Sequence, residues 1–247
     1  MCELFAMSAG QQYTAQDYLP RFADKARDNM SGWGIGFFRE GQVHIEKSCE
    51  GIYEGDMVHD SFRCLARVIG SRIIISHIRC PKAGHQQESQ AQPFSDHFLE
   101  HHWLFSFTGE ARGGLSYDSP RPVMPEPLQA ARVFEYVRDG VEEQLAAWPG
   151  SSLYQGLAVT CKKLITQYPG KYAFFLANET VLFAFLNHGE ILTYRPPEAS
   201  GESLVLTTVS GGLTRAPELW CAYANEDPQR GQILVISGAD LLYLGHI

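Results

Sequence analysis

The sequence predicts an α+β fold with two stacked β-sheets, in a single domain that spans residues 1–247. Strand-like segments dominate the first half of the chain, amphipathic helices occupy its middle, and only strands follow residue 172. No internal repeat and no linker interrupts the chain, and a domain of this length usually folds as one unit. Two strand-rich halves with helices between them favour two sheets that pack face to face.

The first half of the chain combines strands with two helices. A short polar helix is expected over residues 17–29, and a second helix with one apolar face over residues 54–69. Between them, residues 33–38 and 43–46 are typical of a hairpin. Residues 72–79 form a β-branched run that is too apolar to be half solvated. This run predicts a central strand.

The middle of the chain begins with an aromatic strand expected over residues 102–110. Two amphipathic helices are expected over residues 128–147 and 151–167, the second with Ser151 or Ser152 as its N-cap. These helices separate the two strand-rich halves.

The last part of the chain contains strands alone. They are expected over residues 172–177, 181–186, 191–194, 204–208, 233–236 and 241–244. Asn178-Glu179 and His188-Gly189 have the composition of hairpin turns. The pattern therefore predicts consecutive antiparallel strands.

The composition is that of an ordinary globular domain, with 45% hydrophobic and 19% charged residues. The net charge of -8 argues against a nucleic-acid partner, because phosphates demand a basic surface. The N-terminus has no basic and apolar leader, and no run reaches the roughly 20 apolar residues of a membrane span. We therefore expect a cytoplasmic protein that has no membrane partner.

The spacing of cysteine and histidine residues does not indicate a metal site. The six cysteines are scattered without a C-x-x-C spacing, which predicts neither a zinc site nor a disulfide framework. The cluster of Asp96, His97, His101 and His102 fits no usual ligand pattern, and adjacent histidines on a strand point to opposite faces. We expect no metal and no cofactor.

Cys2 is the first candidate for chemistry. Removal of Met1 would leave an N-terminal cysteine with both a thiol and an α-amine. The thiol is a nucleophile, and an α-amine with a pKa of roughly 7.7–8.0 is a base near neutrality. The alternative is a small buried hydrophobe in a first strand, which on position alone is the more common case.

Arg79 is the second candidate, because it ends the central strand expected over residues 72–79. A buried arginine is costly unless it meets an anion, and its planar fork suits a carboxylate. A structural salt bridge is the alternative. Arg79 is therefore a candidate group for binding a carboxylate.

Several short motifs follow one another along the chain. They are Met1-Cys2, Gly32-Trp33-Gly34-Ile35-Gly36, His77-Ile78-Arg79, Pro93-Phe94, a Trp-x-aromatic strand ending in Gly109, a hairpin from Phe174-Phe175-Leu176 to Tyr194-Arg195-Pro196, and Gly231-Gln232-Ile233-Leu234-Val235. Their order and spacing resemble the class II glutamine amidotransferases, in particular the short stand-alone members. The resemblance covers nearly the whole chain. The glycine-rich motif is not a phosphate loop, because it leads into a strand instead of a helix.

The resemblance implies a four-layer αββα N-terminal-nucleophile hydrolase fold, with two antiparallel sheets between helices. It implies that the Cys2 thiolate attacks a side-chain amide while the α-amine shuttles the proton, after which ammonia leaves and water resolves a thioester. Arg79 would bind the substrate α-carboxylate, and Trp33 and Gly34 would border the pocket. Gly109 would supply one backbone N–H of the oxyanion hole.

Three positions depart from the pattern of this family. Thr108 stands where the family has the asparagine of the second oxyanion donor, and a hydroxyl donates with a shorter reach than an amide. Pro127 stands where the family has the aspartate that holds the glutamine ammonium, and Glu126 is its substitute if the loop shifts by one residue. The segment 90–92 (Gln-Ala-Gln) replaces an Asn-Thr-His sequence.

These departures surround the inferred pocket, which indicates a changed substrate or lost catalysis. The leading hypothesis is an amide hydrolase that uses Cys2 and acts on glutamine, a modified γ-glutamyl compound or another carboxylate-bearing amide. The alternative is a catalytically inactive relative that serves as a binding or regulatory module. An acylase like those that cleave bile-salt or penicillin amides is a third hypothesis, without support from the motifs at Trp33 and His77. Transfer of ammonia to an acceptor would require a separate synthase or acceptor protein.

Overall fold

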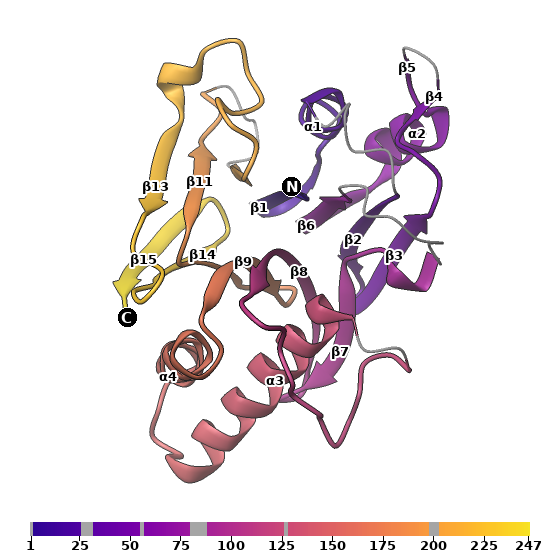
Figure 1. Cartoon of the computed structure of the whole chain (residues 1–247). Coiled ribbons are helices and arrows are strands. Elements are labelled where there is room, and N and C mark those ends of the chain that lie inside the picture. The colour runs from indigo at the N-terminus through magenta and orange to yellow at the C-terminus, as the bar shows by residue number, and fades with distance from the viewer. Residues whose placement is uncertain (1, 26–31, 55–56, 80–87, 126–127, 198–202) are drawn as a thin grey trace.

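The protein is built from two β-sheets that stack face to face, with helices on the outer face of each sheet (Figure 1). The computed structural model describes residues 2–25, 32–54, 57–79, 88–125, 128–197 and 203–247. The larger sheet contains β1 (Glu3–Thr14), β2 (Trp33–Arg39), β3 (Gln42–Ser48), β6 (Gly70–Ile78), β11 (Gly189–Tyr194), β12 (Ser203–Thr207) and β13 (Cys221–Asn225). The smaller sheet contains β7 (Phe94–Phe98), β8 (His101–Ala111), β9 (Gly170–Ala177), β10 (Leu182–Leu186), β14 (Gln232–Ser237) and β15 (Asp240–His246).

The strand order places β1 and β6 inside the larger sheet. That sheet has the order β13-β11-β12-β1-β6-β2-β3, and the smaller sheet has the order β15-β14-β10-β9-β8-β7. Every strand pair within the described residues is antiparallel. A short ladder of β4 (Tyr53–Glu54) and β5 (Met57–Val58) stands apart from both sheets.

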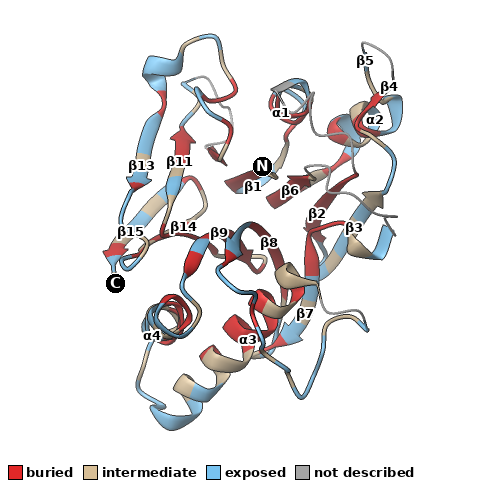
Figure 2. Cartoon of the chain, viewed as in Figure 1, coloured by how far each residue is buried: buried red, intermediate tan, exposed pale blue. Residues whose placement is uncertain are grey.

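Four α-helices within the described residues complete the layers. They are α1 (Leu19–Lys25), α2 (Asp60–Val68), α3 (Gln129–Ala147) and α4 (Leu153–Gln167). Phe22 of α1 and Phe62 of α2 share one core with the larger sheet, and Phe134 of α3 shares another with the smaller sheet. A third core, which includes Leu4 and Leu104, fills the space between the sheets. Figure 2 shows buried residues on the strands and on the faces of the helices that meet them. The four-layer αββα prediction is confirmed.

The helix expected over residues 54–69 is shorter in the structure. Met57 and Val58 belong to β5, and the helix begins only at Asp60. The ring nitrogen Nδ1 of His59 accepts a hydrogen bond from the backbone N–H of Ser61, which caps the helix at its N-terminus. Met57 has the spacing of the apolar residues expected on the buried face of this helix, yet it is 65% exposed. The apolar spacing at Met57 therefore does not indicate burial.

The first helix begins two residues later than expected. The expectation covered residues 17–29, and α1 spans Leu19–Lys25. The end of the expected range, residues 26–29, lies outside the described residues. The two central helices agree closely with their predictions. Ser152 caps α4 in a capping box, in which its hydroxyl accepts from the Gln155 N–H while the Gln155 side chain accepts from the Ser152 N–H.

The prediction of a hairpin turn at His188-Gly189 is wrong. It joins β10 of the smaller sheet to β11 of the larger one, so the chain changes sheets at this point. The turn at Asn178-Glu179 does form a hairpin, because β9 pairs directly with β10. Strands β7 and β13 were not expected from the sequence.

The described ranges contain neither a helix suited to span a membrane nor a cluster of metal-binding side chains. None of the helices there combines the length and hydrophobicity that a membrane span requires. In the same ranges, no group of three or more histidine, cysteine or acidic side chains is arranged to hold a metal ion. His97 and His102 face each other across the β7–β8 ladder, and Asp96 forms an ion pair with Arg138.

Candidate active site

Cys2 precedes the start of β1 and Arg79 follows the end of β6, so the two residues lie side by side at one end of these neighbouring strands. The register pairs Glu3 with Ile78, so Cys2 and Arg79 are the next residues on the two neighbouring strands. Leu4 of β1 packs in the core between the sheets, and side chains alternate along a strand. Cys2 therefore shares the face of Leu4, which is turned toward the smaller sheet.

Strand β8 supplies the opposite wall from the smaller sheet. Leu104 of β8 packs in the same central core, and alternation places Thr108 on that face as well. The Thr108 hydroxyl donates a hydrogen bond to the backbone carbonyl of Cys2 at 2.9 Å. This bond ties the two sheets together at the position of the candidate nucleophile.

One cavity of about 170 Å³ unites four of the residues that the sequence singled out. Its lining consists of Cys2, His77, Arg79, Gln90, Gln92, Phe107, Thr108, Gly109, Leu128, Gln129 and Ala130. Sites for drug-sized ligands usually measure roughly 300–1,000 Å³. The volume of this cavity therefore suits a substrate of about the size of an amino acid.

Trp33 and Gly34 are not among the lining residues. Trp33 is buried and packs edge-to-face against Phe62, with ring centroids 5.1 Å apart. A Cβ atom on Gly34 would lie 2.1 Å from the backbone oxygen of Gln92, which itself lines the cavity. The two residues thus lie behind the cavity wall, and their role as its border stays a prediction. Glu126 lies outside the described residues.

Gly109 has a backbone that only glycine tolerates without strain. Its φ angle is +141°, and a Cβ atom would lie 2.0 Å from the backbone oxygen of Lys171. A side chain at this position would push β8 away from β9. The geometry explains the glycine, while the donation of its N–H to an oxyanion stays a prediction.

Thr108 already uses its hydroxyl proton. A hydroxyl has a single proton to donate, and the Cys2 carbonyl accepts it. The hydroxyl must turn away from Cys2 before it can donate to a developing oxyanion. The role of second oxyanion donor stays a prediction and requires this change.

Arg79 has no carboxylate partner within the described ranges of the chain. None of the ion pairs there involves it, so the alternative of a structural salt bridge has no support in those ranges. Its backbone N–H donates to the carbonyl of Gly32 at 2.9 Å, which fixes the chain where it leaves β6. The guanidinium group is thus available to an anionic substrate.

His77 and Gln92 are functional candidates that the sequence reasoning did not assign. The Gln92 side-chain oxygen accepts from the Phe107 N–H at 2.6 Å, which fixes the orientation of its amide. The Gln92 amide nitrogen donates to the Phe107 carbonyl at 3.1 Å and lies 3.3 Å from Nε2 of His77. Nε2 must therefore accept, which leaves the imidazole proton on Nδ1.

Nδ1 of His77 has no hydrogen-bond partner in the described structure, although the side chain is buried. Burial, together with the nearby positive charges of Arg79 and Lys47, lowers the pKa of His77 to about 3. The imidazole is consequently neutral near pH 7. In the sequence, His77 belonged to the motif His77-Ile78-Arg79, which gave this residue no role of its own.

His77 makes the stability of the protein depend on pH. The folded pKa of about 3 lies below the unfolded value of roughly 6.5, so the unfolded state binds the proton more tightly. The resulting stability is complete above pH 6.5 and is lost as the pH falls toward 3. We expect His77 to account for about 2–3 kcal/mol of lost unfolding free energy at pH 4.5 relative to pH 7.

Urea unfolding at both pH values tests this expectation. His77→Gln should lose less stability between pH 7 and pH 4.5 than the natural protein does, whereas the exposed His44→Gln should behave like the natural protein. An identical loss in His77→Gln and in the natural protein would show that His77 takes up no proton on unfolding.

Two stacked antiparallel sheets between layers of helices are the fold of the N-terminal-nucleophile hydrolases. The family model of the class II glutamine amidotransferases matches residues 1–200. The chain therefore belongs to the class II glutamine amidotransferases.

Similarity to a curated protein is more distant. An uncharacterised protein of Methanocaldococcus jannaschii is 24% identical over 190 residues, which cover 76% of this chain and 51% of that protein. The chain thus spans about half the length of this relative.

Two solved structures share the fold. A predicted glutamine amidotransferase from Pseudomonas aeruginosa aligns with a TM-score of 0.63 and 16% identity, over 98% of this chain and 100% of that one. The glutamine phosphoribosylpyrophosphate amidotransferase of B. subtilis aligns with a TM-score of 0.57 and 12% identity, over 100% of this chain and 49% of that one. At these identities the likeness shows the fold alone.

Proposed function

We propose that the protein is an amide hydrolase of the glutaminase type, with Cys2 as its nucleophile. The observation that supports the proposal is the single cavity lined by Cys2, Arg79 and Gly109. After removal of Met1, the α-amine of Cys2 takes the thiol proton, and the thiolate attacks the amide carbon of the substrate. The protonated amine then gives this proton to the departing ammonia, and water hydrolyses the thioester.

The polar groups in the cavity favour a substrate with a carboxylate and additional hydrogen-bond acceptors. Arg79 is the only charged side chain among the described lining residues. Nδ1 of His77 and the amide nitrogen of Gln129 are buried donors that have no partner in the described structure. Buried donors without partners are costly, so a substrate that accepts from them gains affinity.

The lining also favours a substrate without a charged amine. Its described residues include no carboxylate that would hold an ammonium group. A site loses affinity when a charged group enters it without a partner. We therefore propose a modified γ-glutamyl compound, or another carboxylate-bearing amide with a blocked amine, ahead of free glutamine.

A binding or regulatory module is the second candidate function. The bond from the Thr108 hydroxyl to the Cys2 carbonyl favours it, because this bond removes one candidate oxyanion donor. In such a module the cavity would bind a carboxylate ligand through Arg79 without turnover.

Intact-mass measurement with an alkylating glutamine analogue separates the two candidates. We expect the purified protein to lack Met1 and to gain one adduct on Cys2, with faster labelling by an analogue whose amine is acylated. Retained Met1, or a Cys2 that neither analogue labels, would contradict the hydrolase and favour the binding module. Faster labelling by the analogue with a free amine would contradict only the proposed substrate class.

Arg79→Gln tests recognition of the carboxylate. We expect KM to rise about ten- to a hundredfold with a smaller change in kcat, because one charge-assisted hydrogen bond is worth about 1.5–3 kcal/mol. The matched control is Arg72→Gln, an exposed arginine on the same strand, which should leave KM unchanged. An unchanged KM in Arg79→Gln would remove this residue from the site.

A further inference from the structure

We propose that a second cavity, between α1 and the loop that follows β12, binds a small molecule carrying a phosphate group. The cavity measures about 800 Å³. It is lined by Arg21 and Asp24 of α1 and by Gly211, Leu213, Thr214, Arg215 and Pro217 of the loop. It shares no lining residue with the candidate active site, and the inference does not rest on the proposed hydrolase.

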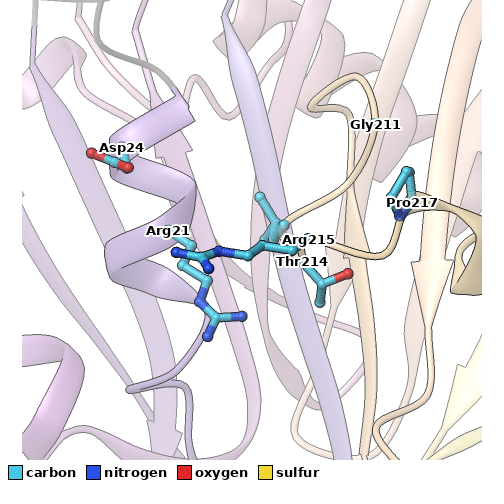
Figure 3. Close-up of a pocket in the computed structure, with 7 residues that line it drawn as sticks. Arg21, Asp24, Gly211, Thr214, Arg215 and Pro217 are labelled. Atoms are coloured by element: carbon cyan, nitrogen blue, oxygen red, sulfur yellow. The ribbon is translucent and has the colours of Figure 1, made fainter.

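Two arginines provide the positive charge of this cavity. Figure 3 shows the side chains of Arg21 and Arg215 extending from α1 and from the loop into the space between them. Within the described parts of the chain, neither forms an ion pair with a carboxylate. Acidic residues outnumber basic ones in the chain, 28 to 20, so the two arginines do not lack ion-pair partners because acidic residues are rare. Like charges repel, and a bound anion would relieve this repulsion.

Asp24 does not neutralise the two arginines. Its carboxylate accepts a hydrogen bond from the Tyr53 hydroxyl at 2.6 Å. Figure 3 shows it at the other end of α1, pointing away from the two guanidinium groups. With two arginines and one carboxylate, the lining carries a formal charge of +1.

The loop that carries Arg215 is packed before any ligand arrives. The indole N–H of Trp220 donates to the Thr214 hydroxyl at 2.9 Å, and the Trp220 ring stacks on Tyr194 with centroids 5.0 Å apart. Gly212 has a φ angle of +72°, and a Cβ atom there would lie 2.6 Å from the Trp220 ring. The backbone that presents Arg215 is therefore held in place by packing.

The opposite wall is equally well anchored. Leu19 and Phe22 of α1 are fully buried in the core between this helix and the outer face of the larger sheet. Their packing fixes the helix that presents Arg21. Preorganised walls reduce the entropy lost on binding. Two planar guanidinium forks match the oxygen geometry of a phosphate group. The volume lies in the range of small-molecule sites, so the phosphate would belong to a larger metabolite.

Calorimetric titration of the full chain with pyrophosphate tests the proposal, with inorganic phosphate and succinate as companion probes. We expect saturable binding of pyrophosphate that weakens with salt, and weaker binding of phosphate. Arg21→Gln and Arg215→Gln should each weaken pyrophosphate binding about ten- to a hundredfold, as loss of a charge-assisted hydrogen bond does. The control is Arg230→Gln, which removes an exposed arginine paired with Asp227 and should bind like the natural protein.

Three results would overturn the proposal. The first is no saturable pyrophosphate binding at millimolar concentration, and the second is equal binding by the natural protein and both arginine variants. The third is succinate binding as tight as that of pyrophosphate, which would identify a carboxylate site. Labelling of Cys2 by glutamine analogues is measured separately, so failure of this proposal and failure of the proposed hydrolase are distinguishable.

Discussion

Replacement of Cys2 by alanine is expected to lower amide hydrolysis at least about 10³-fold while the fold is retained, as loss of a nucleophile does in other hydrolases. Cys2 precedes β1 and is only partly buried, so removal of its sulfur leaves the sheet pairing intact. Alanine keeps the α-amine and allows removal of Met1, which isolates the contribution of the thiol. Ammonia release from carboxylate-bearing amides measures the effect.

Cys64→Ala is the matched control for this prediction. Cys64 is an exposed cysteine on α2, so its loss should change neither turnover nor stability. Turnover that survives in a processed Cys2→Ala protein would contradict the assignment of Cys2 as nucleophile. A natural protein that keeps Met1 would have the amine of Cys2 in a peptide bond, and its inactivity would favour the binding module.

The helices that cover the smaller sheet were predictable because their signals are local. Ser152 and Gln155 lie three residues apart, which is the spacing of a capping box, and both of its hydrogen bonds form. The central strand β6 was predictable for a similar reason, since its apolar run needs burial on both faces. Local chemistry therefore fixes these elements before any tertiary contact is considered.

The exchange of sheets between β10 and β11 could not be predicted from local signals. All five residues of β10 are buried, so the strand has no alternation to show which face meets which layer. A strand that is buried on both faces has the same apolar sequence pattern in either sheet. The strand β7 was missed for another reason, because its turn to β8 uses Leu99 and Glu100 with φ angles of 50° and 62°. Turns with positive φ usually carry glycine or asparagine, and these residues give no such signal.

The lining of the cavity was predictable only in part. The motifs behind the family resemblance include Cys2, Arg79 and Gly109, which line one cavity, whereas Trp33 and Gly34 of the same motifs do not line it. The contact between His77 and Gln92 joins β6 to the segment that precedes β7, which no spacing along the chain reveals. The same holds for the bond from Thr108 to Cys2, which changes the expected role of the hydroxyl.

Arg138→Met is expected to lower the unfolding free energy by about 3–5 kcal/mol, because it removes a buried cation and leaves two half-buried carboxylates without this partner. Arg138 is 1% exposed. It donates to Asp139 at 2.7 Å and to Asp96 at 2.5 Å, and also to the Ser119 hydroxyl at 2.6 Å. Burial opposes the charge of Arg138, yet the bonds to Asp139 and Asp96 outweigh it and raise the pKa of the guanidinium.

The network also explains where the loss of Arg138 would act. Asp96 lies on β7, Ser119 lies in the loop before α3, and Arg138 and Asp139 lie on α3 itself. A single buried guanidinium thus fastens three segments to one another. The pKa of Asp139 is lowered because hydrogen bonds from Arg138, Ser119 and Tyr117 outweigh the effect of burial, so Asp139 stays ionised and would be left without its cation.

Urea unfolding of Arg138→Met and of a second-site variant measures this loss. Arg138→Met combined with Asp139→Asn should recover part of the stability, since the second change removes a stranded charge. Arg63→Met is the control, because its pair with Asp60 on α2 is exposed and worth less than about 1 kcal/mol. A loss of under about 1 kcal/mol in Arg138→Met, or no recovery in the double variant, would show that solvent screens these charges. The stability would then come from packing of the loop on α3 and not from the buried arginine.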